Sequence, residues 1–130
     1  MSTFPKDERL NSRKQIAALL AGGNKMHIYP FRIYWMLSSC DTPSFHLEAA
    51  FSVPKKKFKR AVWRNRIKRM MREAFRLEKE GLKSGLADTA GNLSLLIIYT
   101  PKKEEPYPVI HQGTHKMLEE LKKRILEQTP

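Results

Sequence analysis

The residues of this 130-residue chain that could do chemistry are concentrated in one basic stretch. Residues 55–76 contain eleven Lys or Arg and one acid, Glu73, whereas the other 108 residues are nearly balanced, with 14 basic and 12 acidic side chains. Guanidinium and ammonium groups bind phosphate oxygens, and the planar fork of arginine matches two oxygens at once. A local excess of positive charge of this size indicates a surface that binds a polyanion such as a nucleic acid.

A helix is expected to display these charges. From Ala61 onward the stretch has an α-helical period, with apolar residues on one arc and cations on the other. The apolar arc holds Trp63, Ile67, Met70, Met71, Ala74, Phe75 and Leu77, and the polar arc holds Asn65, Arg66, Lys68, Arg69, Arg72 and Arg76, with Arg64 at its border. An ordinary solvated helix face mixes charges of both signs, so this arc favours a binding surface. Residues 55–60 lack an apolar period, and they are expected to form a basic loop that leads into the helix.

The segments before the basic stretch predict a helix and two strands. Ser12 can cap a helix that runs to about Ala21, where two glycines end it. Residues 31–38 and 45–53 alternate apolar and polar side chains, which predicts an antiparallel pair of strands with one face buried. Arg32 and Tyr34 lie on the other face, which could offer a platform for stacked bases. A tyrosine on an exposed strand face is also common simply because tyrosine favours strands.

The segments after the basic helix predict a third apolar strand and a last helix. Residues 81–91 contain three glycines and are expected to form a loop, and residues 93–99 form a continuous apolar run that suits a strand covered on both faces. Residues 100–108 are expected to be a linker, and residues 109–127 a helix. The pattern leaves open whether a further strand precedes the basic helix. The length predicts one domain, residues 1–130, with a flexible N-terminal arm at residues 1–10.

Several kinds of protein are disfavoured by what the sequence lacks. No apolar run approaches the ~18–20 residues of a membrane span, and the first 20 residues carry charges throughout. The single cysteine, Cys40, rules out an internal disulfide and fits a reducing compartment. We therefore expect a soluble cytoplasmic protein that does not enter a membrane.

No convincing catalytic or metal site of the chain's own emerges from the sequence. His111 and His115 have the i,i+4 spacing that can hold zinc, but no third ligand lies near them in the sequence, so an exposed helix face is favoured. A nuclease that works with its own side chains usually needs clustered carboxylates to hold metal ions, and acids are sparse around the basic stretch. The sequence therefore predicts no catalytic residue and no metal ligand on this chain.

The exact order of residues in the basic stretch indicates a particular protein family, which its charge alone does not. Lys55-Lys56, the run RAVWRNRIKR at residues 60–69, and the following Arg72 closely resemble the RNR signature of the bacterial ribonuclease P protein component. Three upstream features resemble that family in the same order along the chain. They are Arg9-Leu10 before a short helix and Gly23, the strand start at residues 29–32, and Phe51-Ser52-Val53 before the lysines.

The resemblance implies a fold and a function. The implied fold is a single-domain α+β two-layer sandwich in the order α-β-β-β-α-β-α, with a left-handed crossover around the basic helix. The implied function is that of the protein subunit of ribonuclease P, a ribonucleoprotein endonuclease that removes the 5′ leader from precursor tRNA. In that enzyme the RNA subunit uses Mg²⁺ for the chemistry, and the protein itself binds no cofactor. One protein per catalytic RNA is expected.

The resemblance also implies two sets of binding residues. The surface that faces the catalytic RNA would comprise Lys55, Lys56, Arg60, Arg64, Asn65, Arg66, Lys68, Arg69 and Arg72. The cleft that binds the leader would comprise Ile16, Leu20, Arg32 and Tyr34. Family members often carry Phe at the first two of these positions, and aliphatic side chains cannot stack on a base. Leader binding is therefore expected to be weaker here or to depend more on the tyrosine and the arginine.

Two other functions remain as alternatives. A structural RNA-binding protein of the ribosomal type could carry the same basic helix without any role in processing. A DNA-binding regulator could place the helix in a major groove, but the sequence has no helix-turn-helix spacing and nothing that indicates a dimer. We therefore expect precursor tRNA and a catalytic RNA, rather than DNA, as the partners.

Overall fold

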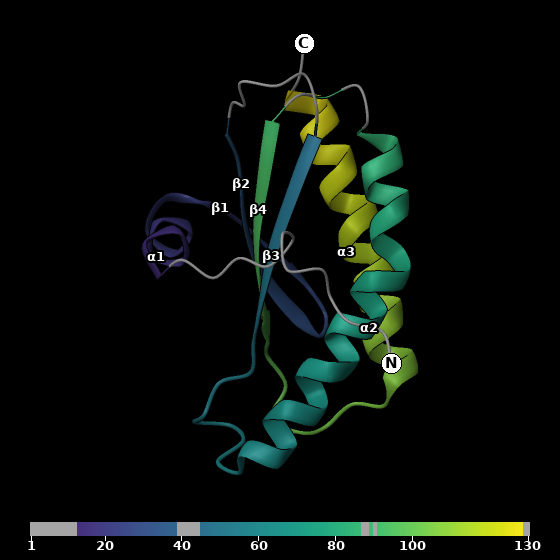
Figure 1. The fold of residues 1–130 in the computed structure, drawn as a ribbon. Helices are drawn as coiled ribbons and strands as arrows, with labels where there is room; N and C mark the ends of the chain where they lie inside the picture. The colour runs from purple at the N-terminus through teal and green to yellow at the C-terminus, as the bar shows by residue number, and fades with distance from the viewer. Residues whose placement is uncertain (1–12, 39–44, 87–88, 90, 129–130) are drawn as a thin grey trace.

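The computed structural model describes residues 13–38, 45–86, 89 and 91–128. The elements are α1 (Arg13–Gly22), β1 (Asn24–Ile28), β2 (Phe31–Ser38), β3 (Phe45–Ser52), α2 (Ala61–Gly85), β4 (Gly91–Tyr99) and α3 (Tyr107–Gln128). This order, α-β-β-β-α-β-α in a single α+β domain, confirms the predicted fold class (Figure 1). The predicted N-terminal arm, the Ser12 cap and Cys40 lie outside the described residues.

The four strands form one mixed sheet in the order β1-β2-β4-β3. β2 pairs antiparallel with both β1 and β4, whereas β3 pairs parallel with β4. The predicted direct pairing of the strands at residues 31–38 and 45–53 is therefore wrong, because β4 lies between them. β4 is the most apolar strand, and a central position buries both of its faces. The handedness of the crossover from β3 through α2 to β4 stays a prediction.

The further strand that the sequence left open is β1, which lies before β2 and not directly before the basic helix. Its sequence NKMHI buries only Met26, so its alternation is too short and too polar to stand out. β1 lies at the edge of the sheet, where one side of a strand is unpaired, and polar edge strands are common. Its Lys25 and His27 share the sheet face that carries Arg32 and Tyr34, because they are their register partners in β2.

The main core lies between one face of the sheet and the pair of helices α2 and α3 (Figure 1). Phe31, Ile33 and Trp35 enter it from β2, and the helices contribute Phe75 and Leu121 among others. The short helix α1 lies on the opposite face, where Leu19 packs on Leu96 of β4. No helix in the described part of the chain is long and apolar enough to cross a membrane.

The two long helices run in the same direction, and α2 starts well before α3. Glu78 of α2 contacts His111 and His115 of α3, and further along, a side-chain atom placed on Gly85 would meet Lys122. The first turns of α2 therefore have no part of α3 beside them, as Figure 1 shows. This explains why Trp63, predicted on the buried arc, is 37% exposed.

The C-terminal half of α2 differs from the sequence prediction in two ways. The helix continues to Gly85, so the loop predicted to begin at Gly81 begins later. Leu77, predicted on the apolar arc, is also exposed, because the residues that meet the sheet and α3 are Ile67, Met71, Ala74, Phe75 and Leu82.

Candidate nucleic-acid interface

The basic loop between β3 and α2 is fastened to the body of the protein. The backbone N–H groups of Lys57 and Phe58 donate to the Pro54 carbonyl at 3.2 and 3.3 Å, which closes a turn. The Phe58 ring packs against Tyr99 with ring centres 5.9 Å apart. The ammonium group of Lys57 donates to the backbone carbonyl of Thr100. The loop therefore has a defined shape before any ligand binds.

Arg64 joins this loop to the helix. Its guanidinium group donates through one nitrogen to the carbonyl oxygens of Phe58 at 2.7 Å and Lys59 at 2.8 Å. The sequence predicted that Arg64 contacts RNA. In the structure its side chain also holds the basic loop against the start of α2. Arginine has five N–H donors, so the remaining donors of this group can still contact a phosphate.

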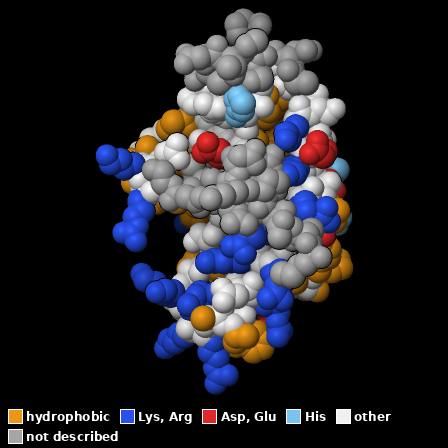
Figure 2. All heavy atoms as spheres, in the orientation of Figure 1, with side chains coloured by type: hydrophobic (Ala, Val, Ile, Leu, Met, Phe, Trp, Pro, Cys, Tyr) orange, Lys and Arg blue, Asp and Glu red, His pale blue; other side chains and the backbone are white. Residues whose placement is uncertain are grey.

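Six predicted cations are available to a ligand. Their side chains make no ion pair or hydrogen bond with any residue that the structure describes, and all are at least partly exposed: Lys55, Lys56, Arg60, Lys68, Arg69 and Arg72. Asn65 is exposed on the same helix. Figure 2 shows Lys and Arg side chains gathered at the lower end of the molecule, where Figure 1 places the basic loop and the start of α2. We call the set of residues 55–72 on this end the basic surface.

The start of α2 adds to the positive potential of the basic surface. Arg60 is the N-cap residue and makes no side-chain cap hydrogen bond, and the first turn contains no acid. The first backbone N–H groups of a helix have no intrahelical partner, and the helix dipole is positive at this end. Both effects favour an anionic ligand such as a phosphate group.

Arg66 differs from its neighbours because it is held on two sides. One guanidinium nitrogen lies 3.4 Å from a carboxylate oxygen of Glu104, and the guanidinium carbon lies 4.8 Å from the centre of the Trp63 ring. Glu104 belongs to a segment that folds back on Tyr99, whose hydroxyl donates to the Lys103 carbonyl at 2.7 Å and accepts from the Glu105 N–H at 2.8 Å. Burial raises the pKa of this tyrosine to about 12.

The residues predicted to bind the leader lie on the other face of the sheet. Ile16 of α1 and Tyr34 of β2 pack against the same small cluster around Leu19 and Leu96, so the structure brings helix and strand together. Leu20 is 51% exposed beside them on the helix. Arg32 lies two residues from the tyrosine on the same strand face. Their role in leader binding stays a prediction.

Sequence reasoning missed Lys25 and His27 because it did not find β1. The ammonium group of Lys25 lies 5.9 Å from the centre of the Tyr34 ring, and His27 pairs in register with Arg32. The alternation of residues 24–28 around Met26 was the only available signal. With these two residues, the sheet face next to α1 carries more basic side chains than the sequence indicated.

His111 and His115 also have a partner that the sequence could not place. The carboxylate of Glu78 on α2 lies between them, with one oxygen 3.0 Å from Nε2 of His111 and the other 2.6 Å from Nδ1 of His115. The two histidine side chains are 37% and 59% exposed, as expected, and they also join α3 to α2 through Glu78. Hydrogen bonds from His115 and then His111 lower the pKa of the Glu78 carboxyl. No group of three or more His, Cys, Asp or Glu in the described part of the chain could hold a metal ion.

Comparison with known sequences decides the family. The sequence model of the Ribonuclease P family matches residues 4–122, which is most of the chain. The chain belongs to this family. The ribonuclease P protein component of Porphyromonas gingivalis is 40% identical over 83 residues, which cover 64% of this chain and 60% of that protein. The chain thus spans about 60% of the length of the curated relatives it matches.

Solved structures of ribonuclease P proteins share the fold. A mutant of the Staphylococcus aureus protein superposes with a TM-score of 0.68 at 23% identity, and covers 90% of both chains. The Thermotoga maritima protein gives a TM-score of 0.66 at 19% identity, with 87% of this chain and 96% of that chain covered.

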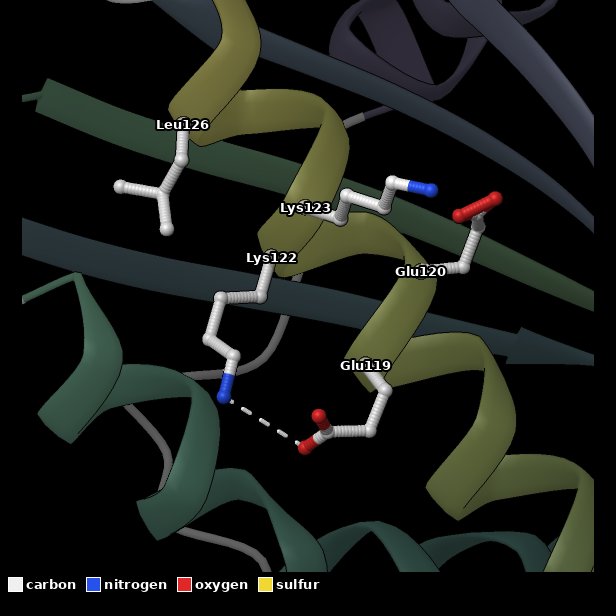
Figure 3. A pocket seen from close by; sticks show the side chains of 5 residues that line it. All are labelled: Glu119, Glu120, Lys122, Lys123 and Leu126. Carbon is white, nitrogen blue, oxygen red and sulfur yellow. Dashed lines mark ion pairs between the residues drawn. The ribbon is translucent and has the colours of Figure 1, made fainter.

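A hollow on α3 is a poor candidate for a second site that binds nucleic acid. It is lined by Glu119, Glu120, Lys122, Lys123 and Leu126, all from one helix (Figure 3). The Lys122 ammonium and Glu119 carboxylate lie 3.5 Å apart, and the lining carries both signs of charge. It therefore lacks the one-sign character of the basic surface.

Proposed function

We propose that this chain is the protein subunit of a ribonuclease P holoenzyme. Its basic surface would bind the catalytic RNA, and α1 with the adjoining sheet face would bind the 5′ leader of precursor tRNA. The observation that carries this proposal is the basic surface itself, where six cations lie side by side on a preformed loop and helix without protein partners among the described residues. Membership of the Ribonuclease P family supports the same function.

The chemistry belongs to the RNA subunit in this proposal. Mg²⁺ ions held by the RNA would supply the activated water for hydrolysis of the phosphodiester bond. The described residues of the protein do not fit such ions, because no cluster of acids lies on or beside the basic surface. The protein would instead neutralise phosphate repulsion between the two RNAs, through contacts whose strength depends on salt but not on sequence.

A cleavage assay at low Mg²⁺ tests the proposal. A leader-bearing precursor tRNA is incubated with a bacterial ribonuclease P RNA, with this protein, and with both. We expect cleavage at the mature 5′ end only in the mixture. Cleavage by the protein alone would contradict the assignment of chemistry to the RNA. Binding to the RNA without any stimulation of cleavage would favour a structural RNA-binding protein.

The leader site is tested separately by comparing two substrates. The complex of protein and catalytic RNA should bind precursor tRNA more tightly than mature tRNA of the same sequence. Tyr34→Ala should reduce this preference, because it removes the aromatic ring next to α1. Equal affinity of the unaltered complex for both tRNAs would overturn the proposed leader site.

A further inference from the structure

An exposed aromatic side chain lies in the middle of the basic surface. Trp63 is 37% exposed, and the cations Arg60 and Arg66 lie three residues before and after it in the sequence. Single exposed apolar residues are common on proteins, so exposure alone carries no functional meaning. Trp63 differs from such residues because its ring contacts a cation that is itself paired with an acid from another segment.

The ring is held by a chain of contacts that begins at the sheet. The hydroxyl of Tyr99 fixes the segment around residues 103–105, and that segment presents Glu104. Glu104 pairs with Arg66, and the guanidinium group of Arg66 lies over the Trp63 ring, 4.8 Å from its centre. A cation–π contact at an exposed site stabilises the arrangement of the two groups by about 0.5–1 kcal/mol. This contact favours one arrangement of the indole on the surface before any ligand binds.

The surroundings of this ring match the chemistry of RNA. No part of α3 lies beside the first turns of α2, so a ligand can approach there (Figure 1). Arg60 lies three residues before Trp63 and Arg69 three residues after Arg66, and neither has a protein partner among the described residues. Phosphates can bind to these cations while a base stacks on the indole, as in other proteins that bind unpaired nucleotides. Figure 2 shows hydrophobic side chains among the cations at this end.

We propose that Trp63, with Arg66, stacks on an unpaired nucleobase of the RNA that the basic surface binds. The proposal rests on the proposed function and adds a contact with a base to the contacts with phosphates. Loops and bulges of a structured RNA supply such bases, since paired bases inside a helix cannot be reached by a side chain. The base could belong to the catalytic RNA or to the precursor tRNA, and the two are separated by the experiment.

Fluorescence provides a direct test because the chain has two tryptophans in very different surroundings. Trp35 is 2% exposed in the core, so its emission should not respond to a surface ligand. Titration with a bacterial ribonuclease P RNA should quench the emission of the unaltered protein, because a stacked base quenches indole fluorescence. Trp63→Phe should bind the same RNA without this quenching. Binding without any quenching in the unaltered protein would overturn the proposal.

Affinity measurements give an independent test with a matched control. Trp63→Ala should weaken binding to the ribonuclease P RNA by about 5- to 150-fold, the range for loss of one stacked base, whereas Trp63→Phe should retain most of the affinity. Val62→Ala is the control, because Val62 is 59% exposed on the same turn and has no ring. Its affinity should change by less than about twofold, as expected for a surface substitution.

The salt dependence separates stacking from charge. Trp63→Ala removes no charge, so the slope of log affinity against log salt should be the same as for the unaltered protein. Equal affinities of Trp63→Ala and Val62→Ala would overturn the stacking proposal while leaving the proposed function intact. Failure of the unaltered protein to bind either RNA would instead overturn the proposed function. Repeating the measurements with precursor tRNA alone shows which RNA supplies the base.

Discussion

At the scale of single residues, neighbouring cations of one motif have different tasks. Arg64 fastens the basic loop through two carbonyl groups, whereas Arg69 has no partner among the residues that the structure describes. The sequence could predict both as cations on a helix, since charge and period are local properties. It could not predict the task of Arg64, because the orientation of the loop carbonyls depends on a turn that only the folded chain has.

Alanine substitutions should separate these tasks. Arg69→Ala should lower the slope of log RNA affinity against log salt by about 0.7–0.9, the contribution of one phosphate contact, with unfolding free energy unchanged within about 0.5 kcal/mol. Arg64→Ala should lower the unfolding free energy by about 1–2 kcal/mol, because two hydrogen bonds from a charged donor are lost. Salt-dependent filter binding and urea unfolding measure the two effects. An unchanged salt slope for Arg69→Ala would mean that this residue does not contact the RNA.

The same limit explains the misplacement of Trp63. Its spacing to Ile67 and Met70 is that of one helix face, so the sequence placed it in the core. Burial also requires a partner element, and no part of α3 lies beside that turn of α2. Helical period thus predicts which residues share a face, but the neighbouring elements decide where along the helix that face is covered.

At the scale of elements, two helical glycines offer a paired test of how α2 and α3 are packed. A methyl group on Gly81 of α2 would meet nothing within 4 Å, whereas one on Gly113 of α3 would lie 2.5 Å from Pro30 Cδ and 2.6 Å from the Tyr29 carbonyl oxygen. Gly81→Ala should therefore raise the unfolding free energy by about 1 kcal/mol through helix propensity. Gly113→Ala should lower it by about 1–3 kcal/mol, because the turn before β2 would have to move.

Urea unfolding of the two variants measures these changes, and each is the control for the other because the substitution is identical. Stabilisation by both would mean that α3 does not pack closely on the turn before β2. The sequence predicts neither sign, since the close approach joins positions more than 80 residues apart.

The contact of Glu78 with two histidines should make the packing of α2 on α3 depend on pH. The folded protein lowers the pKa of this carboxyl below its ordinary value of 4.5, chiefly through the hydrogen bond with His115. The unfolded chain therefore binds more protons in this range, and the stabilisation is present above pH 4.5 and lost as the pH falls through the lowered pKa. The difference in unfolding free energy between the unaltered protein and Glu78→Gln should accordingly shrink in acid.

Unfolding in urea at a series of pH values on both sides of 4.5 measures this difference. Glu119→Gln is the control, because Glu119 is exposed and, among the described residues, its one ion pair is with Lys122 on its own helix. Exposed pairs of this kind contribute about 0–1 kcal/mol. A difference for Glu78→Gln that does not vary with pH would show that the carboxylate contributes nothing through its charge.

At the scale of the whole molecule, the sequence predicts the helices and strands and their order along the chain better than it predicts how they are arranged in space. The helices and three of the four strands follow from periods of 3.6 and 2 within single segments, whereas the α+β class was implied by the family resemblance. The position of β4 between β2 and β3 does not, because strand order depends on pairing between distant segments. The candidate site shows the same division. The basic stretch is contiguous in sequence, so its charge and period could be recognised, whereas Glu104, which pairs with Arg66, comes from the segment between β4 and α3 and was not predicted.

The positive charge of the molecule is concentrated in one stretch of the sequence, and this leads to a last prediction. The basic stretch at residues 55–76 holds a net charge of +10 out of +12. If net charge drove RNA binding, then removal of any two cations would have the same effect. If direct phosphate contacts drive it, only cations on the basic surface will affect the salt slope, because each contact releases condensed counterions locally.

Two double variants of equal charge distinguish these cases. Lys55→Gln with Lys56→Gln removes two exposed cations of the basic loop, and Lys116→Gln with Lys123→Gln removes two exposed cations of α3. The first pair should lower the slope of log affinity against log salt by about 1.4–1.8, whereas the second should leave it unchanged. An equal loss in both would mean that the RNA responds to the overall field, and the basic surface would then have no special part in binding. A decrease in the salt slope for the loop pair alone would place the RNA at the start of α2, where Trp63 also lies.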